Sequence, residues 1–306
     1  MQAYLTRRFL LLGPTLLGVT LITFLMLHLA PGDPVAIMLG EFASTAETAR
    51  LRRELGLDQP LPIQYARFVG RVVSGDLGTS IRSRRAVAEE IGDRLPSTIT
   101  LTLAAIALAA CVGIPLGVVA ATTRRPLVAS GAMAFALLGL SMPTFWSGLL
   151  LILVFALRLG WFPVTEGRGV AILVLPAVAL AAPAAAVLAR ITRSSVLEVL
   201  QHEYVRTARS KGLAESAVVV RHAVRNALIP VLTILGLQFG GLLAGAVIVE
   251  SVFARPGLGR LAVSAILARD FPMAQGIVLI IALMYVFVNV GVDGLYAILD
   301  PRIRYG

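Results

Sequence analysis

The chain has 306 residues, of which 58% are hydrophobic and 14% are charged, and its mean hydropathy is +0.86. Ordinary soluble domains carry about a quarter charged residues, so this composition excludes a single soluble core and predicts an all-α, polytopic membrane protein. The net charge of +10 would also suit a nucleic-acid partner. The basic residues cluster beside apolar stretches, however, which favours the positive-inside pattern of membrane topology.

Six apolar stretches are long enough to cross about 30 Å of hydrocarbon as helices, which takes roughly 20 residues each. Their apolar residues run on without alternation, unlike the strands of a membrane barrel. The first stretch exceeds the core of a signal peptide, and no A-x-A-like cleavage site follows it, which favours an uncleaved first helix. The predicted spans are approximately 9–30, 97–121, 131–157, 170–189, 227–250 and 273–299.

The arginines indicate the orientation of these spans. Arg7 and Arg8 precede the first span, and most other basic residues of short loops share their side of the membrane. Short cytoplasmic loops are enriched in basic residues, so both termini are predicted inside the cell. The predicted parts are a cytoplasmic N-terminus with the first helix (1–30), an extracytoplasmic helical loop (31–96), and a five-helix core (97–306) with a cytoplasmic loop at 190–226.

The outer loop carries the patterns of two helices. In STAETARLRRELG, Ser44 and Glu47 form a capping box and Gly56 ends the helix. A second, amphipathic helix has apolar residues at i, i+3, i+4 and i+7, namely Tyr65, Phe68, Val69 and Val72. These helices form either a cap on the outer membrane face or a docking surface for an external partner, and periodicity does not choose between the two.

The predicted spans contain several glycine pairs at GxxxG spacing and four internal prolines. Such glycines either let helices pack closely in lipid or line a path that changes width. The pairs are Gly113 with Gly117, Gly236 with Gly240, and Gly241 with Gly245. The prolines should bend or locally break their helices, and they are Pro115, Pro143, Pro176 and Pro183.

Few ionisable residues lie in or near the spans, and they are His28, Arg158, Glu250 and Asp293. A carboxylate within a membrane is a functional candidate, so Glu250 and Asp293 are candidates for a coupling-ion site. Such a site is expected near the midplane with several convergent polar groups, and the sequence shows no such cluster. A secondary transporter or channel is therefore disfavoured but remains a rival interpretation.

Several enzyme motifs are missing. HEYVR at 202–206 begins like the zinc motif H-E-x-x-H, but Arg206 stands where the second histidine belongs. No G-x-S-x-G nucleophile motif occurs. The only lysine, Lys211, has no phosphate-binding loop around it, so this chain is not a P-loop ATPase. An ATP-driven process would require ATP hydrolysis by another subunit, and an intramembrane enzyme would need a polar cluster that the sequence lacks.

The segment EYVRTARSKGLAESAVVVRHAVRNALIP at 203–230 is basic, helical in pattern and larger than a simple turn. Gly212 interrupts it near the middle, where a glycine allows a sharp turn or a close backbone approach. The segment is either a surface helix on anionic lipid headgroups or a short helix presented to a cytoplasmic partner. We expect Pro230 to mark where the fifth span resumes.

This segment resembles the cytoplasmic loop of ATP-binding-cassette importer permeases, whose form is E-A-A, three residues, Gly, about nine residues and I-x-L-P. Ala208 and Gly212 match that form, whereas other positions depart from it, namely Arg206, Thr207, His222, Val224 and Arg225. The dipeptide, oligopeptide and nickel-type branch is a closer likeness. Its segments occur here in order, as APGDP, GDLGTS, SMPTFWSGLLLI, YVRTARSKGL, RHAVRNALIPVLT, VFARPGLGRLAVSAILARDFPMAQG and DPRIRYG.

The resemblance implies a type I importer permease fold in the bacterial cytoplasmic (inner) membrane. It implies a second homologous permease, two ATPase subunits that hold ATP and Mg, and an extracytoplasmic substrate-binding protein, with no enzyme activity or cofactor in this chain. The implied cargo is a dipeptide or oligopeptide, with nickel chelates and glutathione-like solutes as alternatives. Alternating access would be driven by the ATPase subunits.

Two groups of site residues follow from the resemblance. The ATPase-docking residues would be Arg206, Thr207, Ala208, Arg209, Lys211, Gly212, Leu213, Ala214 and Glu215. Candidates for contact with the binding protein or for an outer gate are Pro31, Gly32, Asp33, Pro34, Pro256, Gly257 and Gly259.

Overall fold

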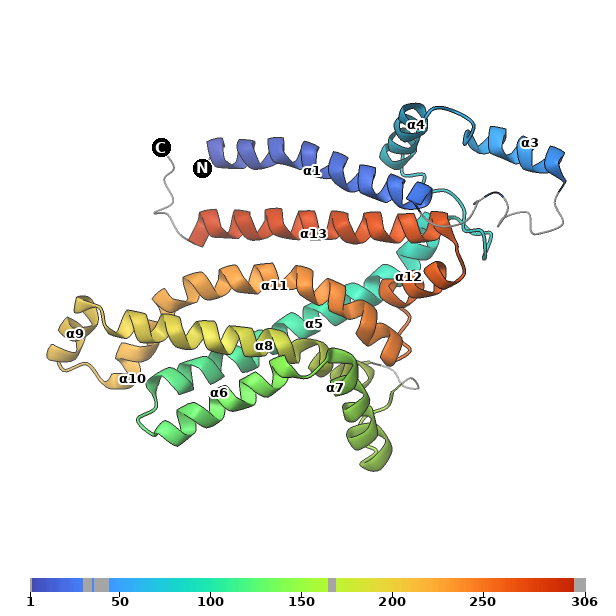
Figure 1. Ribbon diagram of the computed structural model, residues 1–306. Helices are drawn as coiled ribbons and strands as arrows, with labels where there is room; N and C mark the ends of the chain where they lie inside the picture. Colours follow the sequence, from blue (N-terminus) through green and yellow to red (C-terminus); the bar gives the residue numbers. More distant parts are fainter. Residues whose placement is uncertain (1, 30–34, 36–43, 165–168, 300–306) are drawn as a thin grey trace. The chain divides into compact units, whose positions relative to one another are not determined.

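The structure is a computed structural model that describes residues 2–29, 35, 44–164 and 169–299. These ranges are built from helices, joined by turns and short loops, and the described residues contain one isolated β-bridge but no strand (Figure 1). The prediction of an all-α chain is therefore confirmed. The chain forms two compact units, one of Met1–Pro96 with Arg260–Val286 and one of Ser97–Gly259 with Phe287–Gly306.

In the first unit, α4 (Leu61–Val73) packs against α1 (Gln2–Leu29). The unit also holds α3 (Thr45–Leu55), most of α12 (Leu258–Leu267) and the first part of α13 (Phe271–Leu299). On α4, the rings of Tyr65 and Phe68 lie 5.5 and 5.9 Å from the ring of Phe24 on α1. The Tyr65 hydroxyl also donates to the carbonyl of Leu17 at 3.1 Å. The amphipathic face predicted for this helix is thus directed onto α1.

The ends of α3 are those predicted from the sequence. Ser44 accepts a hydrogen bond from the Glu47 amide, and the Glu47 carboxylate accepts one from the Ser44 amide, which completes the capping box. Gly56 ends the helix in the left-handed region at φ 69°, where glycine carries no Cβ penalty. Local chemistry alone therefore sets both boundaries of this helix.

A buried aspartate begins α13 in the first unit. Asp270 is 3% exposed and directly precedes the helix. Its carboxylate accepts hydrogen bonds from the Ser80 hydroxyl and from three backbone amides, those of Ile81, Arg82 and Met273. A carboxylate so placed caps the helix N-terminus and satisfies amides that would otherwise be unpaired. Asp270 thereby holds the turn at 80–82 against the start of α13.

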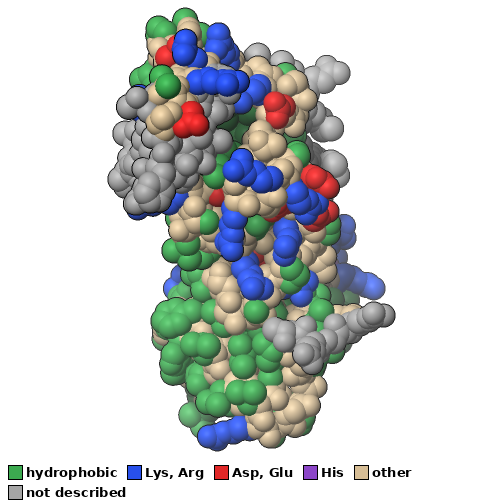
Figure 2. Space-filling view, turned by 90° about the vertical axis from the view of Figure 1, so that its right-hand side faces the viewer, with side chains coloured by type: hydrophobic (Ala, Val, Ile, Leu, Met, Phe, Trp, Pro, Cys, Tyr) green, Lys and Arg blue, Asp and Glu red, His purple; other side chains and the backbone are tan. Residues whose placement is uncertain are grey.

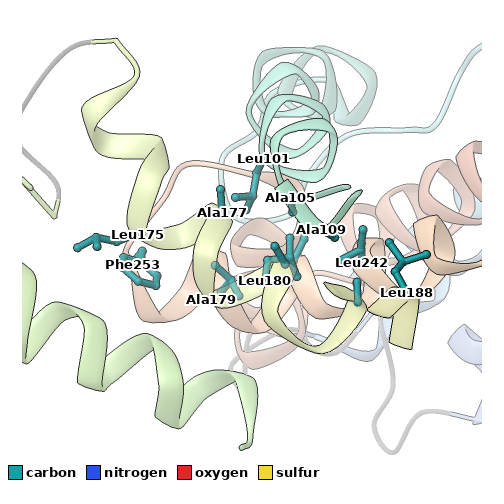
Figure 3. Packing of buried hydrophobic residues seen from close by; sticks show 14 of the residues in the cluster. Leu101, Ala105, Ala109, Leu175, Ala177, Ala179, Leu180, Leu188, Leu242 and Phe253 are labelled. Carbon is teal, nitrogen blue, oxygen red and sulfur yellow. The ribbon is translucent and has the colours of Figure 1, made fainter. Parts of the chain in front are cut away.

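The second unit is built around three long helices, α5 (Val87–Thr122, from Ser97 on), α8 (Ala171–Leu200) and α11 (Arg225–Val252). It also contains the shorter α6 (Pro126–Ser141) and α7 (Thr144–Leu151) and the π-helix η1 (Ile152–Arg158). Its core lies along α8, where alanines and leucines pack against α5 and α11 (Figure 3). Leu101, Leu180 and Leu242 represent the three helices in this core, and each is almost fully buried.

Glycines let α5 approach α8 closely. A Cβ added at Gly113 would lie 2.5 Å from the Ala185 carbonyl oxygen, and one at Gly117 would lie 2.5 Å from the Ala189 carbonyl oxygen. Neither contact is possible for a larger residue. In lipid the hydrophobic effect does not drive helices together, so close packing of this kind supplies much of the association. The first GxxxG pair therefore serves packing, one of the two roles left open by the sequence.

The apolar helices agree with the predicted spans in most places. Four helices are long and apolar enough to cross a membrane in the described residues, namely Val87–Thr122, Ala171–Leu200, Glu215–Val252 and Phe271–Val292. In α1 the apolar stretch of the described side chains is Leu12–Met26. The predicted span 9–30 extends beyond those side chains at both ends and stays a prediction.

The predicted span 131–157 is interrupted at Pro143, one of the prolines predicted to bend or break a helix. The structure divides it into α6 and a second helix, Thr144–Arg158, bent by 104° from the first. Pro143 lacks the amide hydrogen that would continue α6, and it forces Met142 into an extended conformation at ψ 127°. By contrast, Pro176 and Pro183 lie within the continuous α8. Only the first of these three prolines breaks its helix.

Large apolar side chains are exposed along the bent pair of helices. On α6 and α7 they include Phe135, Leu138, Trp146 and Leu149, each at least 45% exposed. Figure 2 shows exposed hydrophobic side chains gathered over part of one face. Contiguous exposed apolar surface marks contact with a membrane or another protein.

A buried carboxyl group fixes the end of α11. Glu250 is fully buried and accepts hydrogen bonds from the Thr98 hydroxyl at 2.6 Å and the Gly259 amide at 2.7 Å. Thr98 in turn accepts from the Leu258 amide at 2.8 Å. A Cβ at Gly257 would collide with the Glu250 carboxyl group. This cluster joins α5, the end of α11 and the turn that follows it.

We predict that Thr98→Val lowers the stability of the purified protein by about 1–3 kcal/mol, because it leaves the buried Glu250 short of a donor and the Leu258 amide short of an acceptor. Thr102→Val is the matched control, since the Thr102 hydroxyl is also buried but bonds only the Thr98 carbonyl of its own helix. The stability of both variants is measured by thermal unfolding in detergent. Equal midpoints for the two variants would contradict the role assigned to the cluster.

Candidate functional site

The connection between α8 and α11 is the candidate site. α8 ends at Leu200, and a short helix, α9 (Glu203–Ser210), is followed by a turn, α10 (Glu215–Ala217) and the π-helix η2 (Val218–Val224). α10, η2 and α11 form one continuous helix, Glu215–Val252. Pro230 lies inside α11, so the expectation that it marks the start of the fifth span is wrong. The helix begins fifteen residues earlier, at Glu215.

One face of α9 is anchored to its neighbours. Val205 and Ala208 are buried together with Val218 of η2, and Val199 and Leu200 at the end of α8 pack against them. The Tyr204 hydroxyl accepts a hydrogen bond from the side chain of Asn226 at 3.0 Å. The short helix is therefore held at a fixed angle to both long helices.

The other face of α9 and the following turn are exposed. Ala208, at 6% exposure, points into the anchoring cluster. The other predicted docking residues are all exposed, namely Arg206, Thr207, Arg209, Lys211, Gly212, Leu213, Ala214 and Glu215. The structure thus brings these residues together at one tip, with Ala208 as the support beneath them.

Gly212 ends α9 in a Schellman turn. Its amide donates to the Arg209 carbonyl at 2.9 Å, and the Leu213 amide reaches the Ala208 carbonyl at 3.4 Å. Gly212 has φ 76°, and a Cβ there would meet nothing within 4 Å. Such turns take glycine because other residues are strained at positive φ. Of the two roles considered for this glycine, the structure supports the sharp turn within the chain.

A two-point ion pair closes the turn from the other side. Arg209 donates from Nε to Glu215 Oε2 at 3.1 Å and from Nη2 to Oε1 at 2.6 Å. The hydrogen bonds from Arg209 lower the pKa of Glu215 below its usual 4.5, with a smaller contribution from the charge of Arg124. The same contact raises the pKa of Arg209. The pair links the end of α9 to the first turn of the long helix.

The predicted outer site is described in part. Pro31, Gly32, Asp33 and Pro34 lie outside the described residues. Pro256 and Gly257 lie in the turn after α11, and Gly259 lies in the first turn of α12, where its amide bonds Glu250. Both glycines have a packing reason there, since a Cβ at Gly259 would lie 2.3 Å from the Val247 Cα. A gating or docking role for this turn stays a prediction.

Sequence reasoning missed two residues that organise the turns before α12 and α13. Thr98 and Asp270 were not singled out, because one apolar-flanked threonine or one aspartate before a helix is common. In the described residues no group of three or more His, Cys, Asp or Glu side chains could hold a metal ion. Glu250, a candidate coupling-ion ligand by sequence, bonds the Thr98 hydroxyl and the Gly259 amide of this chain.

Known proteins resemble the chain over its whole length. Residues 113–305 match the family described as binding-protein-dependent transport system inner membrane component, and residues 1–102 match the N-terminal family of the same membrane component. A glutathione transport system permease protein, GsiC of Salmonella paratyphi A, is 45% identical and aligns over all of both chains. A di/tripeptide transport system permease protein, DppB of Pseudomonas aeruginosa, is 44% identical over all of this chain and 99% of its own.

Two solved structures share the fold. A chain of the MetNI methionine ABC transporter superposes with a TM-score of 0.60 at 15% identity, covering 69% of this chain and 96% of its own. A chain of an amino acid ABC transporter superposes with a TM-score of 0.53 at 21% identity, covering 70% and 94%. At these identities the likeness shows the fold alone.

We predict that Glu215→Gln loosens the Gly212 turn at neutral pH. Because the pKa of Glu215 is lowered in the folded chain, its contribution is complete above about pH 4.5 and disappears as the pH falls through the lowered value. Amide hydrogen exchange at Gly212 and Leu213 should be about twofold to fivefold faster in the variant at pH 7, a modest effect because the pair is exposed.

The ratio of exchange rates should return to one in acid, where Glu215 is protonated in the parent protein. Glu203→Gln is the control, since Glu203 pairs with Arg206 inside α9 and does not bridge the turn. Unchanged exchange in Glu215→Gln at pH 7 would contradict a closing role for the ion pair.

Proposed function

We propose that this chain, which belongs to the family of binding-protein-dependent transport system inner membrane components, is one of two permease subunits of an ATP-driven peptide importer. The chain is a multi-pass membrane protein of that family, with several helices of spanning length. In the proposal, a second homologous permease completes the pathway, two ATPase subunits supply the energy, and an extracytoplasmic binding protein delivers the cargo.

The observation that carries the proposal is the tip formed by α9 and the Gly212 turn. A short helix with one anchored and one exposed face suits a cleft in another protein. α9 does not move independently of its neighbours, because it packs on the end of α8 and on η2. A displacement of the tip would therefore be passed to α8 and to the continuous helix that contains α11.

The tip carries the charges expected for docking to a partner in the cytoplasm. Arg206, Arg209 and Lys211 are exposed there, although two of the three charges are balanced by Glu203 and Glu215. The same observation weakens the alternative of a helix lying on anionic lipid, because only part of the positive charge is available to headgroups. We propose that both termini and this tip are cytoplasmic.

The proposed cargo is a dipeptide or oligopeptide. It rests on the full-length similarity to permeases named for di/tripeptide and for glutathione transport. Glutathione is itself a tripeptide, so the two names describe one chemical class. Nickel chelates remain an alternative cargo. A transporter driven by an ion gradient is the rival of another class. Of its two candidate coupling residues, Glu250 bonds Thr98 and Gly259 of this chain, and the side chain of Asp293 lies outside the described residues.

We predict that Gly212→Trp lowers the amount of ATPase subunit that co-purifies with the chain by at least tenfold and abolishes peptide uptake. The indole would project from the docking tip, and the positive φ would strain the turn. Gly160→Trp is the matched control, since Gly160 has φ 64°, nothing within 4 Å of its Cβ position, and lies in the connection between η1 and α8.

Uptake is measured in vesicles that contain the complete assembly, with ATP inside and a labelled peptide outside. A Gly212→Trp complex that assembled and transported at the rate of the Gly160→Trp complex would refute docking at this tip. Uptake by the chain alone, without ATP, would instead favour the ion-gradient rival.

A further inference from the structure

A cavity of about 220 Å³ lies in the second unit beside the broken span. It is bounded by the end of α6, the start of α7, the middle of α8 and the middle of α11. Leu180 and Leu242, two residues of the hydrophobic core labelled in Figure 3, form part of its wall. The lining residues are Leu140, Thr144, Leu180, Pro183, Ala184, Val187, Gln238, Gly241, Leu242 and Gly245.

Two polar side chains face this apolar cavity without a partner. Gln238 lies halfway along α11 and is partly buried, and its side-chain amide makes no hydrogen bond within the described chain. The hydroxyl of Thr144, at the first turn of α7, likewise has no partner among the described residues. An amide that has no partner in its own chain at the middle of a membrane span is available to bind a ligand, water or another chain.

The glycines of α11 show which of its faces is open. A Cβ at Gly236 would lie 2.4 Å from Val292, so that glycine serves packing between helices of this unit. A Cβ at Gly241 would meet only the Gln238 Oε1, at 4.0 Å. Gly245 is intermediate, with the flexible end of Leu180 at 2.9 Å. Helix packing therefore accounts for Gly236 but not for Gly241, which leaves backbone open to the cavity.

The chemistry of the lining selects a neutral ligand. The described residues that line the cavity are all uncharged, so among them a charged peptide terminus finds no ion-pair partner. A glutamine amide both donates and accepts hydrogen bonds, as a peptide bond does, and the threonine hydroxyl has the same double capacity. Interrupted helices are also where membrane transporters place their binding sites, and the break at Pro143 borders this cavity.

We propose that Gln238, assisted by Thr144, forms a binding point in the transport pathway for the backbone amide groups of the crossing peptide. The inference rests on the proposed function and adds a substrate contact within the membrane. The cavity is smaller than a complete ligand pocket, which typically measures 300–1,000 Å³, and this chain would supply one side of the site.

The test uses the complete assembly in vesicles with saturating, peptide-loaded binding protein and labelled trialanine as the probe. Gln238→Leu removes the amide at similar size. We expect maximal uptake to fall about fivefold to tenfold, the loss expected for one hydrogen bond, and the ATP hydrolysed per peptide to rise by the same factor. Gln238→Asn, which keeps an amide on a shorter side chain, should recover part of the uptake.

Thr233→Val is the matched control, because Thr233 lies on the same helix and bonds only the Ile229 carbonyl of that helix. Gly241→Leu tests the cavity without touching Gln238 and should lower uptake, whereas Ala244→Leu, at an exposed position outside the lining, should not.

Three results would overturn the inference. If the Gln238→Leu variant transported at the rate of the Thr233→Val variant, Gln238 would have no contact with the cargo that affects transport. Reduced recovery of the second permease with Gln238→Leu, at unchanged uptake per assembled complex, would assign the glutamine to a subunit contact. A fall in uptake without a rise in ATP per peptide would assign it to structure. Absence of ATP-dependent trialanine uptake in the parent assembly would instead refute the proposed function itself.

Discussion

The second unit depends on how closely α5 approaches α8. At Gly113 and Gly117 the backbone of α5 lies against carbonyl groups of α8, with no room for a Cβ. Helices in lipid gain little from burying apolar surface against each other, so contact at backbone distance has to supply the attraction. α11 then packs against the residues of α8 that do not contact α5. The connection between α8 and α11 acquires a defined position because both helices are fixed.

In each unit, one buried acidic residue holds a turn at a helix end. Glu250 binds the turn after α11 through the Gly259 amide and reaches α5 through Thr98. In the first unit, Asp270 binds the turn at 80–82 and the first amides of α13. Both carboxyl groups accept hydrogen bonds from a hydroxyl group and from backbone amides, and each thereby holds a turn.

Features that depend on neighbouring residues were predictable from the sequence. The capping box of Ser44 and Glu47, the end of α3 at Gly56 and the apolar face of α4 follow from spacing alone. The clustering of the docking residues was also predictable, because they are close in sequence. That agreement concerns their placement; their function stays a prediction.

Features that depend on partners far along the chain were not predictable. Pro143 breaks its helix whereas Pro176 and Pro183 do not, and the sequence around each gives no means to tell them apart. The bond between Thr98 and Glu250 joins residues 152 positions apart. The open face at Gly241 is likewise visible only beside α8, since Gly236 and Gly241 look alike as members of GxxxG pairs.

The π-helix η2 separates the docking tip from the apolar part of the long helix. A π-helical turn holds more residues than an α-helical turn, so the direction in which side chains point shifts across Val218–Val224. Each residue of an α-helix corresponds to about 100° of rotation. Removing or adding one residue in η2 would therefore rotate the tip about the helix axis relative to α11 while leaving the helix intact. The rotational phase between the exposed tip and the apolar helix is thus encoded separately from either surface.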